Sequence, residues 1–319
     1  MVRSRNRSSP AVVIPPALEG WARLKSLEYE KDSGFAAGAA LNALSTLVNA
    51  EPIYLGALSE RLALHAAAGT SRSLGQLVGE EQIRDEWCLR LGDETMTPAG
   101  RLFAGWRSLV HLRGGIRALA PQQLAELAVQ FGRPLSGSPD VILQAVNVAS
   151  ATMSNPVSAA AAAARVFYEV EPHQETLAHF LADATLATKL GWQRPLPLVA
   201  FNIAAPILRS GGRGRRPVPS DPSWTNAVFG AYALSAVAAI EEARALAHKA
   251  TSLLAFRTKL RAKSADRIVD ALLSHAFLVG SRSIGGMSDR AMRRIYDRLR
   301  SAGVVRELTG RQTFRLYGL

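Results

Sequence analysis

The sequence predicts a mainly α-helical protein, in which a multi-helical body is followed by a C-terminal winged helix of three short helices and a β-hairpin. Apolar residues recur at steps of three and four through most of the chain, as on one face of an amphipathic helix. Between residues 21 and 150 no stretch alternates with a period of two for long enough to form a sheet. Near the C-terminus an arginine-rich helical segment ends at a glycine and is followed by two short β-rich runs.

These patterns divide the chain into three segments. Residues 1–16 combine Arg, Ser and Pro without periodicity, which predicts a flexible basic tail. Residues 17–256 form the helical body, interrupted by a loop rich in Gly, Arg and Pro at residues 209–222. Residues 257–319 form the predicted winged helix-turn-helix.

The composition is that of a globular protein with a basic surface. Of its 319 residues, 48% are hydrophobic and 20% are charged, and the formal net charge is +12. A charge of this size implies a polyanionic partner. The single cysteine, Cys88, excludes an internal disulfide framework and suits a reducing cytoplasm. The most apolar run, residues 227–240, is too short to span a bilayer, so we expect a cytoplasmic protein with no membrane partner.

The body reads as consecutive helices with recognisable ends. Thr97 and Pro98 form a helix start, with threonine at the N-cap and proline at the first helical position. An alanine run after Pro156 favours a helix to which a neighbour can approach closely. A further helix follows Pro172 and stops at Gly191, and a long one covers residues 223–254.

One group of polar residues in the body raises the question of catalysis. Glu175, His179 and Asp183 recur at steps of four and share one helix face, as in a metal or acid–base cluster. The di-iron motif of helical bundles, however, places histidine three residues after glutamate, and no second set matches. We therefore expect a solvated polar stripe, and for Cys88 a core thiol. With no phosphate-binding loop, zinc-protease or nucleophile-elbow motif, the sequence predicts no enzyme, metal or cofactor.

Basic residues gather at two places ahead of the C-terminal segment. In the loop at residues 209–222, arginines accompany glycines that leave backbone N–H groups open to a phosphate. A mobile, solvated connector is the favoured interpretation of this loop. A second basic cluster begins the winged helix. The candidate phosphate contacts are Arg213, Arg215, Arg216, Lys259, Arg261 and Lys263.

The C-terminal segment predicts a three-helix order. A first helix runs from about Ser264 to Ser274, and residues 277–287 supply a turn and a short middle helix. The third helix begins after Ser288, a good N-cap, and ends at Gly303. Residues 304–308 and 313–317 then form the hairpin, whose glycine-containing turn carries Arg311 at its tip.

This arrangement is typical of DNA recognition. A helix can enter the major groove, and arginine can bind phosphate or read guanine through two hydrogen bonds. An arginine at the hairpin tip suits an adjacent phosphate or the minor groove. The candidate DNA contacts are Arg290, Arg293, Arg294, Arg298, Arg311 and Arg315.

The chain also resembles a family of uncharacterised bacterial proteins, the domain of unknown function numbered fourteen-oh-three. The matching stretches are residues 61–68 (RLALHAAA), 84–90 (RDEWCLR), 190–198 (LGWQRPLPL) and 287–319. The C-terminal part also looks like the helix-turn-helix ends of bacterial proteins associated with mobile elements, which share the wing pattern seen here at Glu307–Arg311. The resemblance implies a bacterial protein with a DNA-binding tail and transfers no catalytic residue.

Two functional hypotheses follow from the sequence. The first is a DNA-binding protein, a regulator or DNA-maintenance factor of a bacterial chromosome or mobile element, whose winged helix contacts double-stranded DNA. The alternative is a non-catalytic interaction subunit, whose helical body and winged helix bind a protein partner. In either case the helical body is a candidate surface for homo-oligomer formation.

Overall fold

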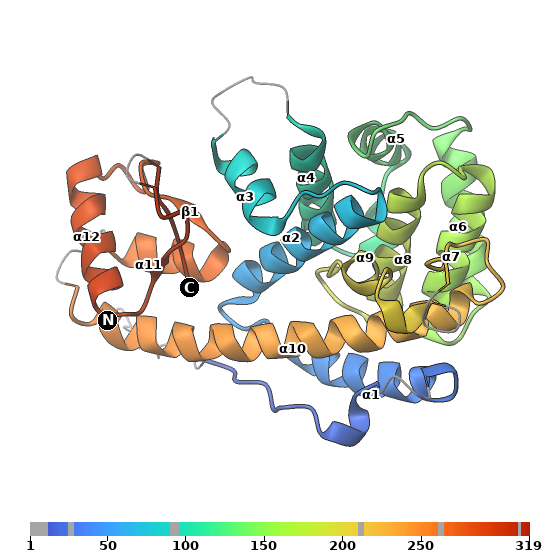
Figure 1. Cartoon of the computed structure of the whole chain (residues 1–319), viewed down its shortest axis with the longest axis horizontal. Helices are drawn as coiled ribbons and strands as arrows, with labels where there is room; N and C mark the ends of the chain where they lie inside the picture. Colours follow the sequence, from blue (N-terminus) through green and yellow to red (C-terminus); the bar gives the residue numbers. More distant parts are fainter. Residues whose placement is uncertain (1–11, 25–28, 90–95, 210–213, 261–264, 312–313) are drawn as a thin grey trace, which may run out of the picture. The chain divides into compact units, whose positions relative to one another are not determined.

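Helices dominate the structure, a computed structural model that describes residues 12–24, 29–89, 96–209, 214–260, 265–311 and 314–319 (Figure 1). Contacts divide the chain into two compact units. The helical unit comprises Ala17–Asn49 and Leu58–Glu242. The C-terminal unit comprises Met1–Pro16, Ala50–Ala57 and Ala243–Leu319. The mainly helical fold predicted from the sequence is confirmed.

Ten α-helices within the described residues begin before residue 243, and their starts follow simple backbone chemistry. Proline occupies the first turn of α4, α5, α6 and α7, where its missing N–H needs no partner. The Thr97 hydroxyl accepts a hydrogen bond from the Gly100 N–H at 3.1 Å, as its predicted N-cap role requires. The helices are α1 Tyr29–Asn49, α2 Leu55–Ser73, α3 Glu80–Leu89, α4 Pro98–His111, α5 Pro121–Gln130, α6 Pro139–Ala151, α7 Pro156–Val170, α8 Glu175–Leu190, α9 Val199–Asn202 and α10 Trp224–Arg257.

Helix α8 lies at the centre of the helical unit. Every residue from Thr176 to Ala187 is buried, so this helix is covered on all sides. It packs most extensively against α7 and also contacts α9, α4 and the 3₁₀ turn η2, Gly115–Ala118. Five of the six alanines at residues 159–164 of α7 are buried, and their lack of side-chain bulk lets the two helices approach closely. Gly191 ends α8 in the left-handed conformation, as predicted.

The C-terminal unit adds two helices and a small sheet. Helix α11 covers Ala265–Ser274 and α12 covers Asp289–Ser301, and the strands are β1 Leu278–Val279, β2 Arg306–Glu307 and β3 Leu316–Gly318. The sheet is antiparallel with the order β1-β3-β2. Leu278 pairs with Tyr317, and Glu307 pairs with Tyr317 from the other side. The central strand therefore holds both outer strands together.

The predicted middle helix of this segment is wrong. Within the described residues, strand β1 and a series of turns occupy residues 278–287, between α11 and α12. Gly285 and Gly286 have φ values of 64° and 76°, in the left-handed region that a right-handed helix cannot use. The Gly280 N–H donates to the Arg315 carbonyl at 2.8 Å and continues the pairing of β1. The backbone of residues 278–280 therefore pairs with the sheet, in the segment where a helix was expected.

Most of the predicted basic tail lies outside the described residues. Its last part is held within the C-terminal unit, because the Tyr54 hydroxyl donates to the Val13 carbonyl and the Arg244 guanidinium donates to the Pro15 carbonyl at 2.7 Å. Gly56 lies close to α11, where an added Cβ would stand 2.4 Å from the Ser274 carbonyl oxygen. Among the described residues, no helix combines the length and apolar character that crossing a membrane requires.

Candidate nucleic-acid interface

Helix α12 has both of the end signals that the sequence predicts. The Ser288 hydroxyl accepts a hydrogen bond from the Ala291 N–H, which makes it the N-cap. At the other end Gly303 adopts a φ of 70°, and the Val304 N–H donates back to the Leu299 carbonyl at 3.2 Å. This backbone pattern satisfies the last carbonyls of the helix and fixes its length.

The two faces of α12 differ sharply in polarity. Met292, Ile295, Tyr296 and Leu299 are buried. The Tyr296 ring stacks on the Tyr317 ring of β3 with centroids 4.1 Å apart, which joins the helix to the sheet. The opposite face carries five exposed arginines and two exposed aspartates: Arg290, Arg293, Arg294, Arg298, Arg300, Asp289 and Asp297.

Arg290, Arg293 and Arg294 lie in the first two turns of this exposed face. Steps of three and four residues place them side by side along the helix. Among the described residues, none forms a hydrogen bond or an ion pair with these three guanidinium groups, while the Ser288 cap fixes the backbone that carries them. Three guanidinium groups held along one short helix face can meet consecutive phosphates or a base edge.

Arg298 and Arg315 have contacts within the unit. The Arg298 Nη2 donates to the Lys259 carbonyl at 2.9 Å, which ties α12 to the chain after α10. The Arg315 Nη1 lies 4.0 Å from the Asp297 Oδ1 and is exposed. Both guanidinium groups are therefore oriented by the protein and keep donors facing outward.

The turn after β2 has its own polar bracing. The Glu307 carboxylate accepts hydrogen bonds from the Thr309 N–H at 2.9 Å and from the Gly310 N–H at 3.1 Å. Partial burial raises the pKa of Glu307, but these hydrogen bonds outweigh it and hold the pKa below its usual range. The Thr309 hydroxyl donates across the turn to the Phe314 carbonyl at 2.7 Å. Arg311 is exposed directly after this braced turn.

Of the six candidate phosphate contacts, the structure describes Arg215, Arg216 and Lys259. Arg213, Arg261 and Lys263 lie outside the described residues. Lys259 is exposed, and its Nζ lies 5.8 Å from the centroid of the Phe256 ring. Arg215 is 71% exposed and donates to Asp221 at 2.8 Å. Arg216 is half-buried.

Arg216 has a strong partner inside the helical unit. Both of its terminal nitrogens donate to the Glu175 carboxylate, with Nη2 2.7 Å from Oε2. The paired carboxylate raises the pKa of Arg216, so the guanidinium is stabilised in its charged form. This pair fixes the described part of the predicted 209–222 loop to the first turn of α8.

The expectation of a solvated polar stripe on α8 is wrong. His179 is 3% exposed and Asp183 is 1% exposed. Trp224 covers the His179 ring, with centroids 5.7 Å apart and the rings nearly parallel. Burial lowers the pKa of His179 to about 4, so the ring is neutral at physiological pH. The helical period correctly placed these residues on one face, but that face lies inside the unit.

Asp183 has a structural role at the start of α9. Its carboxyl oxygens accept the N–H groups of Leu198 at 2.9 Å and Val199 at 3.2 Å. Burial raises the pKa of Asp183 to about 8, although these backbone hydrogen bonds act in the opposite direction. Within the described residues, no group of three or more His, Cys, Asp or Glu side chains is arranged to hold a metal ion.

Cys88 fits a packing role. Burial raises the pKa of its thiol to about 12, so the reactive thiolate is scarce near neutral pH. The thiol is half-buried in α3.

Formal charge is concentrated in one part of the sequence. Residues 243–319 contain 16 of the 38 Lys and Arg residues and 5 of the 26 Asp and Glu residues, so they carry +11 of the net charge of +12. Residues 1–242 are almost balanced, with 22 basic and 21 acidic side chains. The basic character of the protein is therefore a property of the stretch that contains α12 and the sheet.

Sequence reasoning missed two features of this region. Strand β1 has only two residues, and its partner lies 38 positions later in the sequence. Phe256, which lines a pocket beside α12, gave no separate signal because it continues the apolar pattern of α10.

Comparison with known proteins places the chain in a family. The family model described as a protein of unknown function (DUF1403) matches residues 7–319, nearly the whole chain. A search of curated proteins gives no match. The match confirms the family that the four sequence stretches resembled. The chain therefore belongs to the DUF1403 family.

Proposed function

We propose that this protein binds double-stranded DNA through its C-terminal unit. In this proposal the exposed arginine face of α12 enters the major groove, and Arg311 beside the braced turn contacts a neighbouring phosphate. The unit is a winged helix in which strand β1 and turns take the place of the middle helix. Such a protein would act as a regulator or DNA-maintenance factor in the cytoplasm.

The observation that carries the proposal is the polarity of α12. Its buried face consists of apolar and aromatic side chains, and its exposed face of arginines with only two aspartates. The formal charge of +11 on residues 243–319 attracts a polyanion and supports the same partner. Asp289 lies in the first turn, where its charge stabilises the positive end of the helix dipole.

The test is the affinity of the full chain for a fully paired duplex, measured by fluorescence anisotropy. We expect Arg293→Ala combined with Arg294→Ala to weaken binding about thirtyfold or more, because each of the two lost phosphate or base contacts contributes about 1 kcal/mol or more. The matched control is Arg113→Ala combined with Arg117→Ala, which removes two exposed arginines from the helical unit. Absence of duplex binding, or an equal effect of the two double variants, would refute the proposal.

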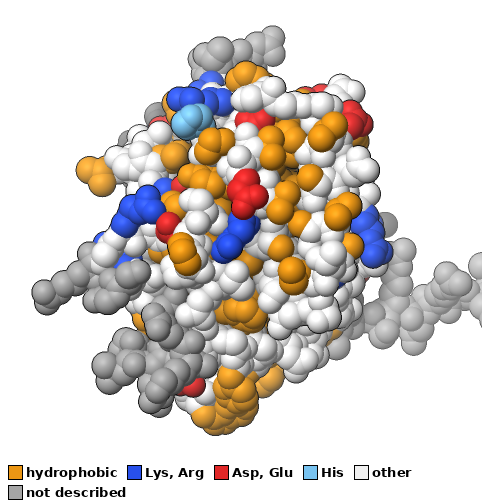
Figure 2. Space-filling view, turned by 90° about the vertical axis from the view of Figure 1, so that its right-hand side faces the viewer, with side chains coloured by type: hydrophobic (Ala, Val, Ile, Leu, Met, Phe, Trp, Pro, Cys, Tyr) orange, Lys and Arg blue, Asp and Glu red, His pale blue; other side chains and the backbone are white. Residues whose placement is uncertain are grey.

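We further propose that the helical unit self-associates through α6. The observation behind this second proposal is an exposed, almost uncharged helix face. Val141 is 64% exposed and Val148 is 60% exposed, and Asp140 is the one ionisable residue of α6. Figure 2, which views the side where α6 and α7 lie in Figure 1, shows many hydrophobic side chains spread among uncharged ones, with charged side chains scattered between them.

A second copy of the chain is the partner that this face fits. Val141 and Val148 are two helical turns apart and share one side, with the small Ala145 between them. An antiparallel two-fold arrangement places Val141 of each copy against Val148 of the other, so the stripe is complementary to itself. With Asp140 as its one ionisable residue, α6 has little charge with which to attract a strongly charged partner. Light scattering of the purified chain tests the proposal, because a single species of 34.2 kDa would contradict it.

A further inference from the structure

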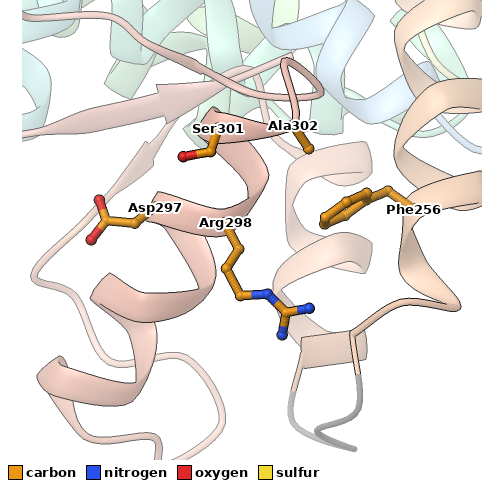
Figure 3. Close-up of a pocket in the computed structure, with 5 residues that line it drawn as sticks. All are labelled: Phe256, Asp297, Arg298, Ser301 and Ala302. Atoms are coloured by element: carbon orange, nitrogen blue, oxygen red, sulfur yellow. The ribbon is translucent and has the colours of Figure 1, made fainter.

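The C-terminal unit contains a pocket between the end of α10 and the outer side of α12. It has a volume of about 410 Å³ and is lined by Phe256, Asp297, Arg298, Ser301 and Ala302. Figure 3 shows the Phe256 ring pointing toward Arg298 and Ala302, while Asp297 points away from the ring. The pocket thus combines an aromatic wall, a small apolar side chain and a cation, and the carboxylate of its one acidic lining residue, Asp297, lies 4.0 Å from the Arg315 guanidinium.

The guanidinium group in this pocket is held in place. The Arg298 Nη2 donates to the Lys259 carbonyl at 2.9 Å, so the side chain is fixed before any ligand arrives. The Nζ of Lys259 itself lies 5.8 Å from the Phe256 ring centroid, which adds a second cation next to the aromatic wall. An aromatic ring and a fixed guanidinium plane are the two surfaces on which nucleobases stack in proteins.

We infer that this pocket binds an unpaired nucleobase, with Phe256 and Arg298 as the stacking surfaces and Lys259 beside the attached phosphate. The combination of planar and cationic groups selects a ligand that is both flat and anionic, which a nucleotide is. A paired base inside a duplex hides its flat faces in the stack, so the base has to be unpaired.

The position of the pocket connects it to the proposed duplex contact, and the inference rests on that proposed function. Arg298 and Ser301 follow Arg293 and Arg294 by one to two turns on the same helix. Arg294 and Arg298 are four residues apart and share one side of α12, so a DNA strand that leaves a duplex held on the arginine face can pass from one arginine to the other. The preferred ligand is accordingly a duplex with a single-stranded end.

The experiment compares two DNAs with the full chain, a fully paired duplex and the same duplex with a short single-stranded overhang. We expect the overhang to raise the affinity about tenfold, within the range that stacking of one base on an aromatic side chain supplies. Phe256→Ala should abolish this gain and leave the affinity for the paired duplex unchanged. Phe256→Trp, which keeps a stacking surface, should retain it.

Further arms distinguish the possible failures. Equal affinity of the natural chain for both DNAs, or a gain that survives Phe256→Ala, would overturn the inference while leaving duplex binding intact. Loss of the gain in Phe256→Leu, with an unchanged thermal unfolding midpoint, would show that the ring matters and not merely the apolar bulk. A free mononucleotide that competes away the gain, but not the duplex binding, would support the pocket as the site of the unpaired base.

Discussion

Two titratable side chains in α8 show how burial changes the chemistry of single residues. The pKa of Asp183 is raised from 3.8 to about 8, and that of His179 is lowered from 6.5 to about 4, in both cases chiefly by burial. Between about pH 4 and pH 8, the folded state therefore keeps a proton on Asp183 that the unfolded state has already released. Between about pH 4 and pH 6.5, the folded state leaves the His179 ring neutral, whereas the unfolded state protonates it.

These two residues affect stability with opposite signs. Asp183 lowers the free energy of unfolding as pH rises from about 4 to about 8, whereas His179 raises it between about pH 4 and pH 6.5. The two contributions oppose each other below pH 6.5. Above pH 6.5 only the contribution of Asp183 remains, which makes this window the informative one.

We predict that Asp183→Asn removes a loss of stability between pH 6.5 and pH 8 that the natural chain shows. The asparagine still offers an oxygen to the N–H groups of Leu198 and Val199 but has no proton to lose. The natural chain should lose up to about 1.4 kcal/mol of unfolding free energy per pH unit relative to the variant. Urea unfolding at both pH values measures this.

The matched control for Asp183 is Asp140→Asn at the exposed start of α6, which should unfold with the same pH dependence as the natural chain. If Asp183→Asn and the natural chain lose stability in parallel across the window, the proton assigned to Asp183 is held elsewhere.

At the scale of elements, predictions succeeded where the signal was local. The cap of α12 needs Ser288 and its end needs Gly303, and both act within one turn of the chain. Strand β1 was missed because its stability comes from pairing with β3, 38 residues later, which no local pattern reports. The polar face of α8 was predicted correctly as a face, but its cover comes from Trp224 and Arg216 on distant segments. The helical period of a sequence predicts which side of a helix a side chain lies on, but it does not predict whether that side is buried.

Helix α6 provides a prediction at the same scale. Val141→Arg combined with Val148→Arg should convert a self-associated protein into a single species of 34.2 kDa. Two guanidinium groups from each copy would face an apolar stripe, and burying them without partners costs far more than the lost valine contacts. Light scattering after size exclusion measures the mass.

Val129→Arg serves as the control for α6. It places a single arginine, half the charge added to α6, on α5 at an exposed valine of the helical unit that lies outside the proposed stripe. Its mass should remain that of the natural chain. A mass that changes equally in both variants would point to a general effect of added charge and away from α6.

At the scale of the whole molecule, residues 1–242 and residues 243–319 differ in their balance of charge. Residues 1–242 carry 22 basic and 21 acidic side chains, whereas residues 243–319 carry 16 and 5. Many basic residues in the first part have partners there, such as Arg61 with Glu242 and Arg107 with Glu60. A cluster of basic residues in the sequence is therefore weak evidence for a polyanion-binding site, because acidic residues of the fold can pair with it. An excess of basic over acidic residues that remains after such pairing is stronger evidence.

This separation of charge predicts how DNA affinity depends on salt. If Arg290, Arg293, Arg294 and Arg311 each neutralise one phosphate, the logarithm of the binding constant should fall with the logarithm of salt concentration with a slope of about −3.6. Arg293→Ala combined with Arg294→Ala should reduce the steepness of this slope by roughly 1.8, since two counterions fewer are released. Arg113→Ala combined with Arg117→Ala removes equal charge from the balanced part and should leave the slope unchanged. Anisotropy titrations of one duplex at several salt concentrations supply all three slopes. A slope near zero would mean that binding neutralises no phosphates and would contradict the proposed contact. A slope that both double variants reduce equally would show that the contact is not confined to α12, because only residues at the phosphates release counterions.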